Sequence, residues 1–215
     1  MSSFNFKNNN SSTNCAYNEL VKFDTSKPMA SFSNQLLAAL TIIILNNLIL
    51  QVILKHYPGK YNKKQNIESV IDKETKNEFK DYSKKLISPN TLMISEVVNA
   101  SIYAPIIEEV FFRFLLLKMF FIKYLKMNVH SAVILHATIF GAFHMTNVIT
   151  SDQEINKTVI QSVSAGLSGI IYGYAYIYTN SIFTPLIAHF INNIMSTTAD
   201  YIEYSRYYKI INKNN

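Results

Sequence analysis

Two adjacent carboxylates and an arginine interrupt an apolar stretch in the middle of this chain. The sequence "PIIEEVFFR" places Glu108, Glu109 and Arg113 among side chains that would suit hydrocarbon. An ionised group near the centre of a membrane helix costs about 2.5–3.5 kcal/mol, so this cluster needs partners. Glu109 and Arg113 stand four residues apart with the acid first, the order that favours an intrahelical ion pair. Glu108 projects about 100° away around the helix, so we expect its partner on a neighbouring segment.

Two further polar motifs lie in later apolar stretches. "FGAFH" pairs Phe140 with His144, and "HFINN" pairs His189 with Asn193, each at a spacing that puts both side chains on one helix face. Together with Glu108, these groups could bind a divalent metal or hold a water that the glutamate deprotonates. Both arrangements lead to hydrolysis. Helix-to-helix hydrogen bonding alone would explain one buried histidine better than it explains ionisable groups on three segments.

In this order the motifs resemble the EExxxR, FxxxH and HxxxN motifs of the CAAX prenyl protease and bacteriocin-processing (CPBP, Abi) family of intramembrane proteases. The resemblance covers roughly residues 92–200. It implies that Glu108 and His144 activate the attacking water, and that His189 and Asn193 stabilise the oxyanion of the tetrahedral intermediate. The residues that it implies as support are Glu109, Arg113 and Phe140.

The resemblance leaves the cofactor open. One expectation is a divalent metal such as zinc, bound by Glu108, His144 and His189. The other is a water activated by the glutamate without any metal. The chain contains no HExxH motif that would decide between them.

A second hydrolytic arrangement would use a serine. "AGLSG" at residues 165–169 resembles the GxSG motif of rhomboid proteases, with Ser168 as nucleophile and His189 as base. This alternative leaves the glutamate motif unexplained. Ala165, Gly169 and Gly173 also form a small-residue ridge at four-residue spacing, which favours close helix packing.

Functions of another kind are a non-catalytic membrane adaptor, a bacteriocin-immunity-type protein, or a small transporter that uses the same charges as a proton relay.

The composition places these motifs in a membrane protein. The 215 residues carry a net charge of +6, and a mean hydropathy of +0.09 averages very polar segments with long apolar runs. Lysines gather beside the apolar runs and form no aromatic-interleaved basic stripe, so we expect no nucleic acid as partner. The expected partners are membrane lipids and a peptide or protein substrate. The oligomeric state is not fixed by the sequence.

The apolar runs predict an all-α, polytopic transmembrane bundle of about five to six spans in the cell membrane, with the active site inside the bundle. Runs suited to crossing lie at 36–54, 91–123, 129–150 and 158–178, and a further helix is predicted to start with Thr184 as cap and Pro185 in its first turn. Pro105 predicts a kink or break in the second run. The lysine-rich loop at 55–91 is expected in the cytoplasm, which with five spans places the C-terminal tail on the same side.

The predicted organisation has five parts. They are a polar, disordered tail (1–33), a first transmembrane anchor (34–55), a lysine-rich loop or surface helix (56–91), a CAAX protease/Abi-like catalytic bundle (92–205) and a polar tail (206–215).

Overall fold

The computed structural model describes residues 27–56, 87–150 and 155–213, and these ranges contain helices and turns but no strand. The all-α prediction is therefore confirmed. The elements are α2 (Phe32–His56), α5 (Pro89–Glu96), η1 (Val97–Tyr103), α6 (Ala104–Glu108), η2 (Glu109–Tyr124), α7 (Val129–Phe143), η3 (His144–Thr146), α8 (Asn147–Thr150), α9 (Ile155–Thr179) and α10 (Phe183–Lys213). Most of the predicted disordered tail and of the lysine-rich loop lies outside the described residues.

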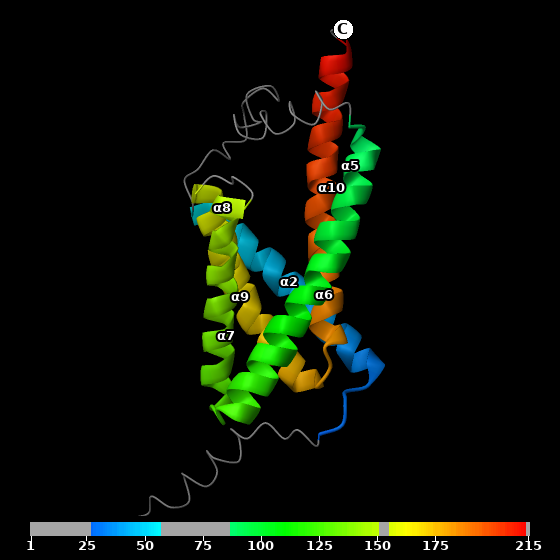
Figure 1. Ribbon diagram of the computed structural model, residues 1–215. Helices are drawn as coiled ribbons and strands as arrows, with labels where there is room; N and C mark the ends of the chain where they lie inside the picture. Colours follow the sequence, from blue (N-terminus) through cyan, green and yellow to red (C-terminus); the bar gives the residue numbers. More distant parts are fainter. Residues whose placement is uncertain (1–26, 57–86, 151–154, 214–215) are drawn as a thin grey trace, which may run out of the picture.

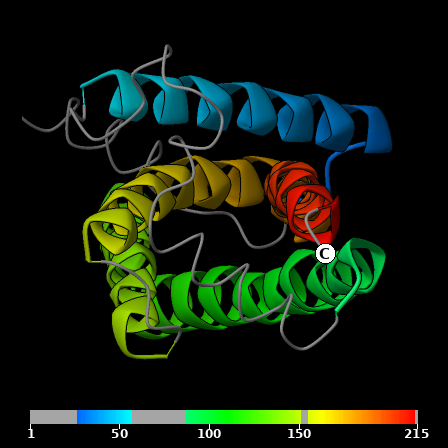
Figure 2. The ribbon, with the colours of Figure 1, turned by 90° about the horizontal axis from the view of Figure 1, so that it is seen from above.

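The helices form a ring with one helix outside it. Segments α5, η1, α6 and η2 join into one continuous rod, which packs against α10 along its first half and against α7 along its second (Figure 1). Helix α9 closes the ring between α7 and α10. Helix α2 lies outside, along α9 and α10, as the view from above shows (Figure 2). The three polar motifs thus come from three sides of one ring.

The break predicted at Pro105 is absent. The rod runs through this residue because its hydrogen-bond ladder changes register there, from π-helical in η1 to α-helical in α6 and back to π-helical in η2. The Ala104 N–H donates to the Asn99 carbonyl, five residues back. Proline has no N–H to donate and its ring crowds the preceding turn, so a wider turn before it lets the helix continue.

The small-residue ridge predicted on α9 does pack closely, and its partner is α7. A Cβ atom on Gly169 would lie 3.2 Å from Ala137. One on Gly141 would lie 2.8 Å from the Ser162 carbonyl oxygen and 3.0 Å from the Cα of Gly166. The Ser162 hydroxyl also donates to the Gly141 carbonyl at 2.7 Å. This backbone-to-backbone approach fixes the position of the end of α7, where the second polar motif lies.

Helix α10 starts one residue before the predicted cap. Asn180, with a φ of 48°, makes the left-handed turn that ends α9. The Ser181 hydroxyl, and not that of Thr184, then accepts a hydrogen bond from an N–H of the first turn, that of Phe183, at 3.3 Å. Pro185 lies in the first turn, as predicted. The helix continues to Lys213, so most of the predicted polar tail is helical.

Two of the described helical segments are long and apolar enough to cross a membrane. They are Phe32–Ile53, with a mean hydropathy of 2.3, and Val129–Ile149, with a mean hydropathy of 1.5. Large apolar side chains also remain exposed on the other rods, among them Ile107, Phe111 and Tyr178. Surfaces of this kind suit a hydrocarbon environment.

Candidate active site

The ion pair predicted within the first motif is present and fully buried. Nε of Arg113 lies 3.1 Å from Oε2 of Glu109, and both side chains have 0% exposure. The guanidinium also lies over two aromatic rings, 4.3 Å from the ring centroid of Phe140 and 5.1 Å from that of Tyr172. Opposite charge and aromatic faces together offset the cost of burying the arginine.

His189 lies between the two glutamates. Its Nδ1 donates to Oε1 of Glu109 at 2.8 Å, and its Nε2 lies 3.8 Å from Oε2 of Glu108. The partner that Glu108 was predicted to need on a neighbouring segment is therefore this histidine of α10. The contact joins residues that are 80 positions apart in the sequence.

The two glutamates differ in exposure. The Glu109 side chain is fully buried, whereas that of Glu108 is 22% exposed. The separation of 3.8 Å between Glu108 and His189 is too long for a direct hydrogen bond, but it lets both groups hold one water molecule between them. Glu109 is thus an internal bridge between Arg113 and His189. The Glu108 side chain is partly exposed, while its Oε2, the atom nearest His189, is buried and has no hydrogen-bond partner among the described residues.

The second motif reaches the site through Phe140. Its buried ring lies 4.9 Å from the ring of His144 and 6.4 Å from that of His189, between centroids. Nδ1 of His144 donates to the Phe140 carbonyl at 2.9 Å. Because a carbonyl only accepts, this bond leaves Nε2 of His144 as an acceptor. His144 is half-buried and makes no direct contact with Glu108 or His189 in the described structure.

Asn193 lies one turn after His189 on α10. Its amide nitrogen donates to the Ala100 carbonyl in η1 at 2.6 Å. An amide nitrogen carries two N–H groups, so one donor remains for another acceptor. The third motif therefore ties α10 to the rod through Asn193 and places His189 beside the glutamates.

The zinc site predicted from Glu108, His144 and His189 stays a prediction. Within the described ranges, no group of three or more His, Cys, Asp or Glu side chains is arranged to hold one. Of the three ligands predicted for zinc, Glu108 and His189 approach each other, and the Nδ1 bonds of His144 and His189 leave Nε2 of each ring for another contact.

The alternative serine site is not assembled. Ser168 is half-buried on α9, and both ring nitrogens of His189 face glutamates. No contact joins Ser168 to His189 among the described residues.

The sequence did not predict three residues that lie beside the site, Tyr172, Asn46 and Asn192. Tyr172 of α9 packs against His189 with ring centroids 5.6 Å apart. Its hydroxyl accepts hydrogen bonds from the side-chain amides of Asn46 and Asn192. The signal that could have found them is the presence of amides inside apolar runs, where each needs an internal partner.

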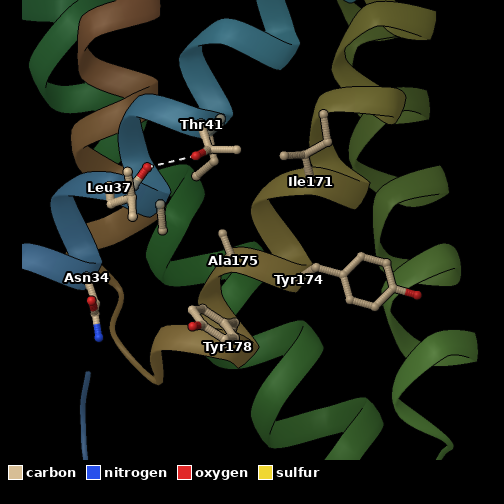
Figure 3. Close-up of a pocket in the computed structure, with 9 residues that line it drawn as sticks. Asn34, Leu37, Thr41, Ile171, Tyr174, Ala175 and Tyr178 are labelled. Atoms are coloured by element: carbon tan, nitrogen blue, oxygen red, sulfur yellow. Dashed lines mark hydrogen bonds between the residues drawn. The ribbon is translucent and has the colours of Figure 1, made fainter. Parts of the chain in front are cut away.

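The groove in Figure 3 is separate from this site. It lies between α2 and α9 and has a volume of about 340 Å³. Its lining is Asn34, Leu37, Ala38, Thr41, Ile42, Ile171, Tyr174, Ala175 and Tyr178. None of the three motifs contributes to it.

The segment that carries these motifs matches a known protein family. Residues 90–195 match the family described as Rce1-like, type II CAAX prenyl endopeptidase Rce1-like. A search of curated proteins and a search of solved structures each found no match. The matched range includes every residue from Glu108 to Asn193, and the family together with the apolar helices indicates a membrane protein of the protease class. Residues 90–195 of this chain thus form a domain of the Rce1-like family of type II CAAX prenyl endopeptidases.

Proposed function

We propose that this chain is a multi-pass intramembrane endopeptidase of the cell membrane, which hydrolyses a peptide bond near the membrane in a peptide or protein substrate. One observation carries the proposal: the partly exposed Glu108 faces Nε2 of His189 across 3.8 Å, over the buried Glu109–Arg113 pair. A carboxylate and an imidazole at this separation can hold and activate one water.

The proposed reaction needs only this chain's residues and water. Glu108 takes a proton from the water as its oxygen attacks the carbonyl carbon of the scissile bond. His189, held at Nδ1 by Glu109, stabilises the oxyanion together with the second N–H of Asn193. Glu108 then returns the proton to the leaving amine as the carbon–nitrogen bond breaks. His144, with its acceptor Nε2, orients the water.

The number of spans is part of the proposal. Five rods make up the described fold, and only two of them contain a window that is apolar enough to qualify alone. The continuous rod, α9 and α10 carry the polar groups of the site or of its supports, which lowers their hydropathy. Helices that bury polar groups among themselves still cross a bilayer, because those groups face the bundle interior.

The product of the reaction tests the proposed function. The full chain, reconstituted in vesicles, is given a peptide that ends in a CAAX sequence, with and without a prenyl group, in water enriched in oxygen-18. Hydrolysis predicts a shortened peptide whose new terminal carboxylate carries one heavy oxygen. The two peptides together show whether the prenyl group is required. A protein that leaves both intact, yet still binds a membrane partner, would instead fit the adaptor or immunity-type alternative.

A further inference from the structure

One tyrosine joins the site to a helix outside the family match. Tyr172 of α9 has 3% exposure. Its hydroxyl oxygen accepts a hydrogen bond from Nδ2 of Asn46 in α2 at 3.0 Å and another from Nδ2 of Asn192 in α10 at 2.8 Å. A single oxygen atom therefore connects three helices, one of which precedes residue 90.

The ring of the same tyrosine contacts the proposed machinery. Its centroid lies 5.6 Å from that of the His189 ring and 5.1 Å from the guanidinium carbon of Arg113. Because the hydroxyl is bonded on two sides, the ring cannot turn away without breaking both hydrogen bonds. The Tyr172 ring is thus held in one orientation against one side of His189, while Nδ1 of His189 is hydrogen-bonded to Glu109.

Helix α2 reaches this tyrosine along a single stripe. Gln35, Ala39, Ile42 and Asn46 follow one another at intervals of four, three and four residues, which places them on one helix face. Gln35 accepts a hydrogen bond from the Ser181 hydroxyl at 2.8 Å, and both Ala39 and Ile42 have 1% exposure.

Beside this stripe, the groove of Figure 3 lies between α2 and α9. The stripe begins and ends in a side-chain amide that is hydrogen-bonded to a residue outside α2. Such pairs fix one register, because a shift by one residue would leave both amides without a partner in an apolar setting.

We infer that the cluster of Asn46, Tyr172 and Asn192 positions His189 for the reaction, and that α2 is therefore a functional part of the catalytic unit. This inference rests on the proposed role of His189. Tyr172 does not touch the reacting atoms in this account. It is a positioning residue that acts through the orientation of the imidazole.

Kinetics of matched variants of the full chain in vesicles test the inference. Tyr172→Phe keeps the ring and removes the hydroxyl, and Asn46→Leu removes its donor. Controls are Tyr176→Phe, one turn later on α9 and 2% exposed, and Asn47→Leu, whose native amide bonds the Ile43 carbonyl of its own helix.

Each test variant should lower kcat about tenfold, the effect of roughly one hydrogen bond, with KM unchanged. The double variant should lose no more than Tyr172→Phe alone, since that variant already removes the Asn46 contact along with the Asn192 one. Wild-type kcat in Tyr172→Phe, or losses that add fully in the double variant, would overturn the inference.

A second measurement does not need turnover. With nitrogen-15-labelled histidine, the ring signals of His189, identified by their loss in His189→Gln, should move in Tyr172→Phe and Asn46→Leu but not in the two controls. Unmoved signals would overturn the positioning role even in an active protein. A wild-type protein without hydrolysis would contradict the proposed function and leave this result standing. Should Asn46→Leu fail to fold, the comparison of Tyr172→Phe with Tyr176→Phe still decides the question.

Discussion

Glu108 and Glu109 are neighbours in the sequence, yet the fold gives their carboxylates different surroundings. Glu109 is enclosed between Arg113 and His189, whereas part of the Glu108 side chain is exposed. The ion pair could be predicted because helix geometry alone brings residues four apart together. That both carboxylates converge on one histidine could not, because it depends on how α10 docks against the rod.

Replacing Arg113 alone should destabilise the protein more than replacing both Glu109 and Arg113. Arg113→Leu leaves the buried Glu109 carboxylate without its arginine and with only the His189 contact, and we expect a loss of about 3–5 kcal/mol in the free energy of unfolding. The double variant Glu109→Leu/Arg113→Leu should lose less, because no uncompensated charge remains. Unfolding in detergent, followed by helical circular dichroism, gives the comparison. A double variant less stable than Arg113→Leu would show that the pair contributes more than mutual neutralisation.

Ser168 and His189 separate the two hydrolytic mechanisms. Ser168→Ala should keep wild-type turnover, since the hydroxyl contacts neither the histidine nor the glutamates. His189→Gln should lose most activity because it removes the group that Glu109 holds and that Glu108 faces. Peptide cleavage in vesicles measures both. Inactivity of Ser168→Ala in a folded protein would favour the serine mechanism.

At the scale of elements, the sequence predicted which helices exist better than it predicted how they meet. Apolar runs gave the positions of α2, α7 and α9, since length and hydropathy decide these. Pro105 misled because its local cost is absorbed by a change of hydrogen-bond register. The Asn46–Tyr172 contact spans 126 residues and leaves no trace in local spacing.

The contact between α7 and α9 should tolerate one added methyl group and not another. Gly141→Ala places its Cβ against backbone atoms at 2.8 and 3.0 Å, so the helices must separate. We expect a loss of about 1–3 kcal/mol in stability and lower activity, because Phe140 and His144 shift with α7.

Gly166→Ala is the matched control for that change. Its nearest neighbour would lie at an ordinary 3.6 Å, and alanine is the better helix former by about 0.5–1 kcal/mol. This variant should therefore be neutral or more stable. Thermal unfolding of the two proteins tests the pair, and equal melting temperatures would contradict the packing account.

For the whole molecule, the ring with α2 outside it defines which ends share a face. The turn between η2 and α7 and the C-terminal end of α10 lie at opposite ends of the bundle (Figure 1). If the proposed multi-pass arrangement is right, these ends lie on opposite sides of the membrane, with the end of α10 in the cytoplasm.

Cysteine labelling tests this arrangement. In a Cys15→Ser background, Tyr124→Cys and Lys209→Cys introduce single thiols at exposed positions at the two ends. An impermeant maleimide applied to intact cells should label the first and reach the second only after permeabilisation. Labelling of both, or of neither, in intact cells would contradict a bundle that crosses the membrane along its long axis.

The most direct test of the account is the single-turnover cleavage rate of Glu108→Gln, compared with Glu96→Gln on the same rod. The amide keeps the size of the side chain but cannot take a proton from water. We predict that Glu108→Gln inserts and folds like the wild type and cleaves about 10²–10⁴-fold more slowly, while Glu96→Gln stays near the wild-type rate. Cleavage by a folded Glu108→Gln at the wild-type rate would show that this carboxylate is not the base.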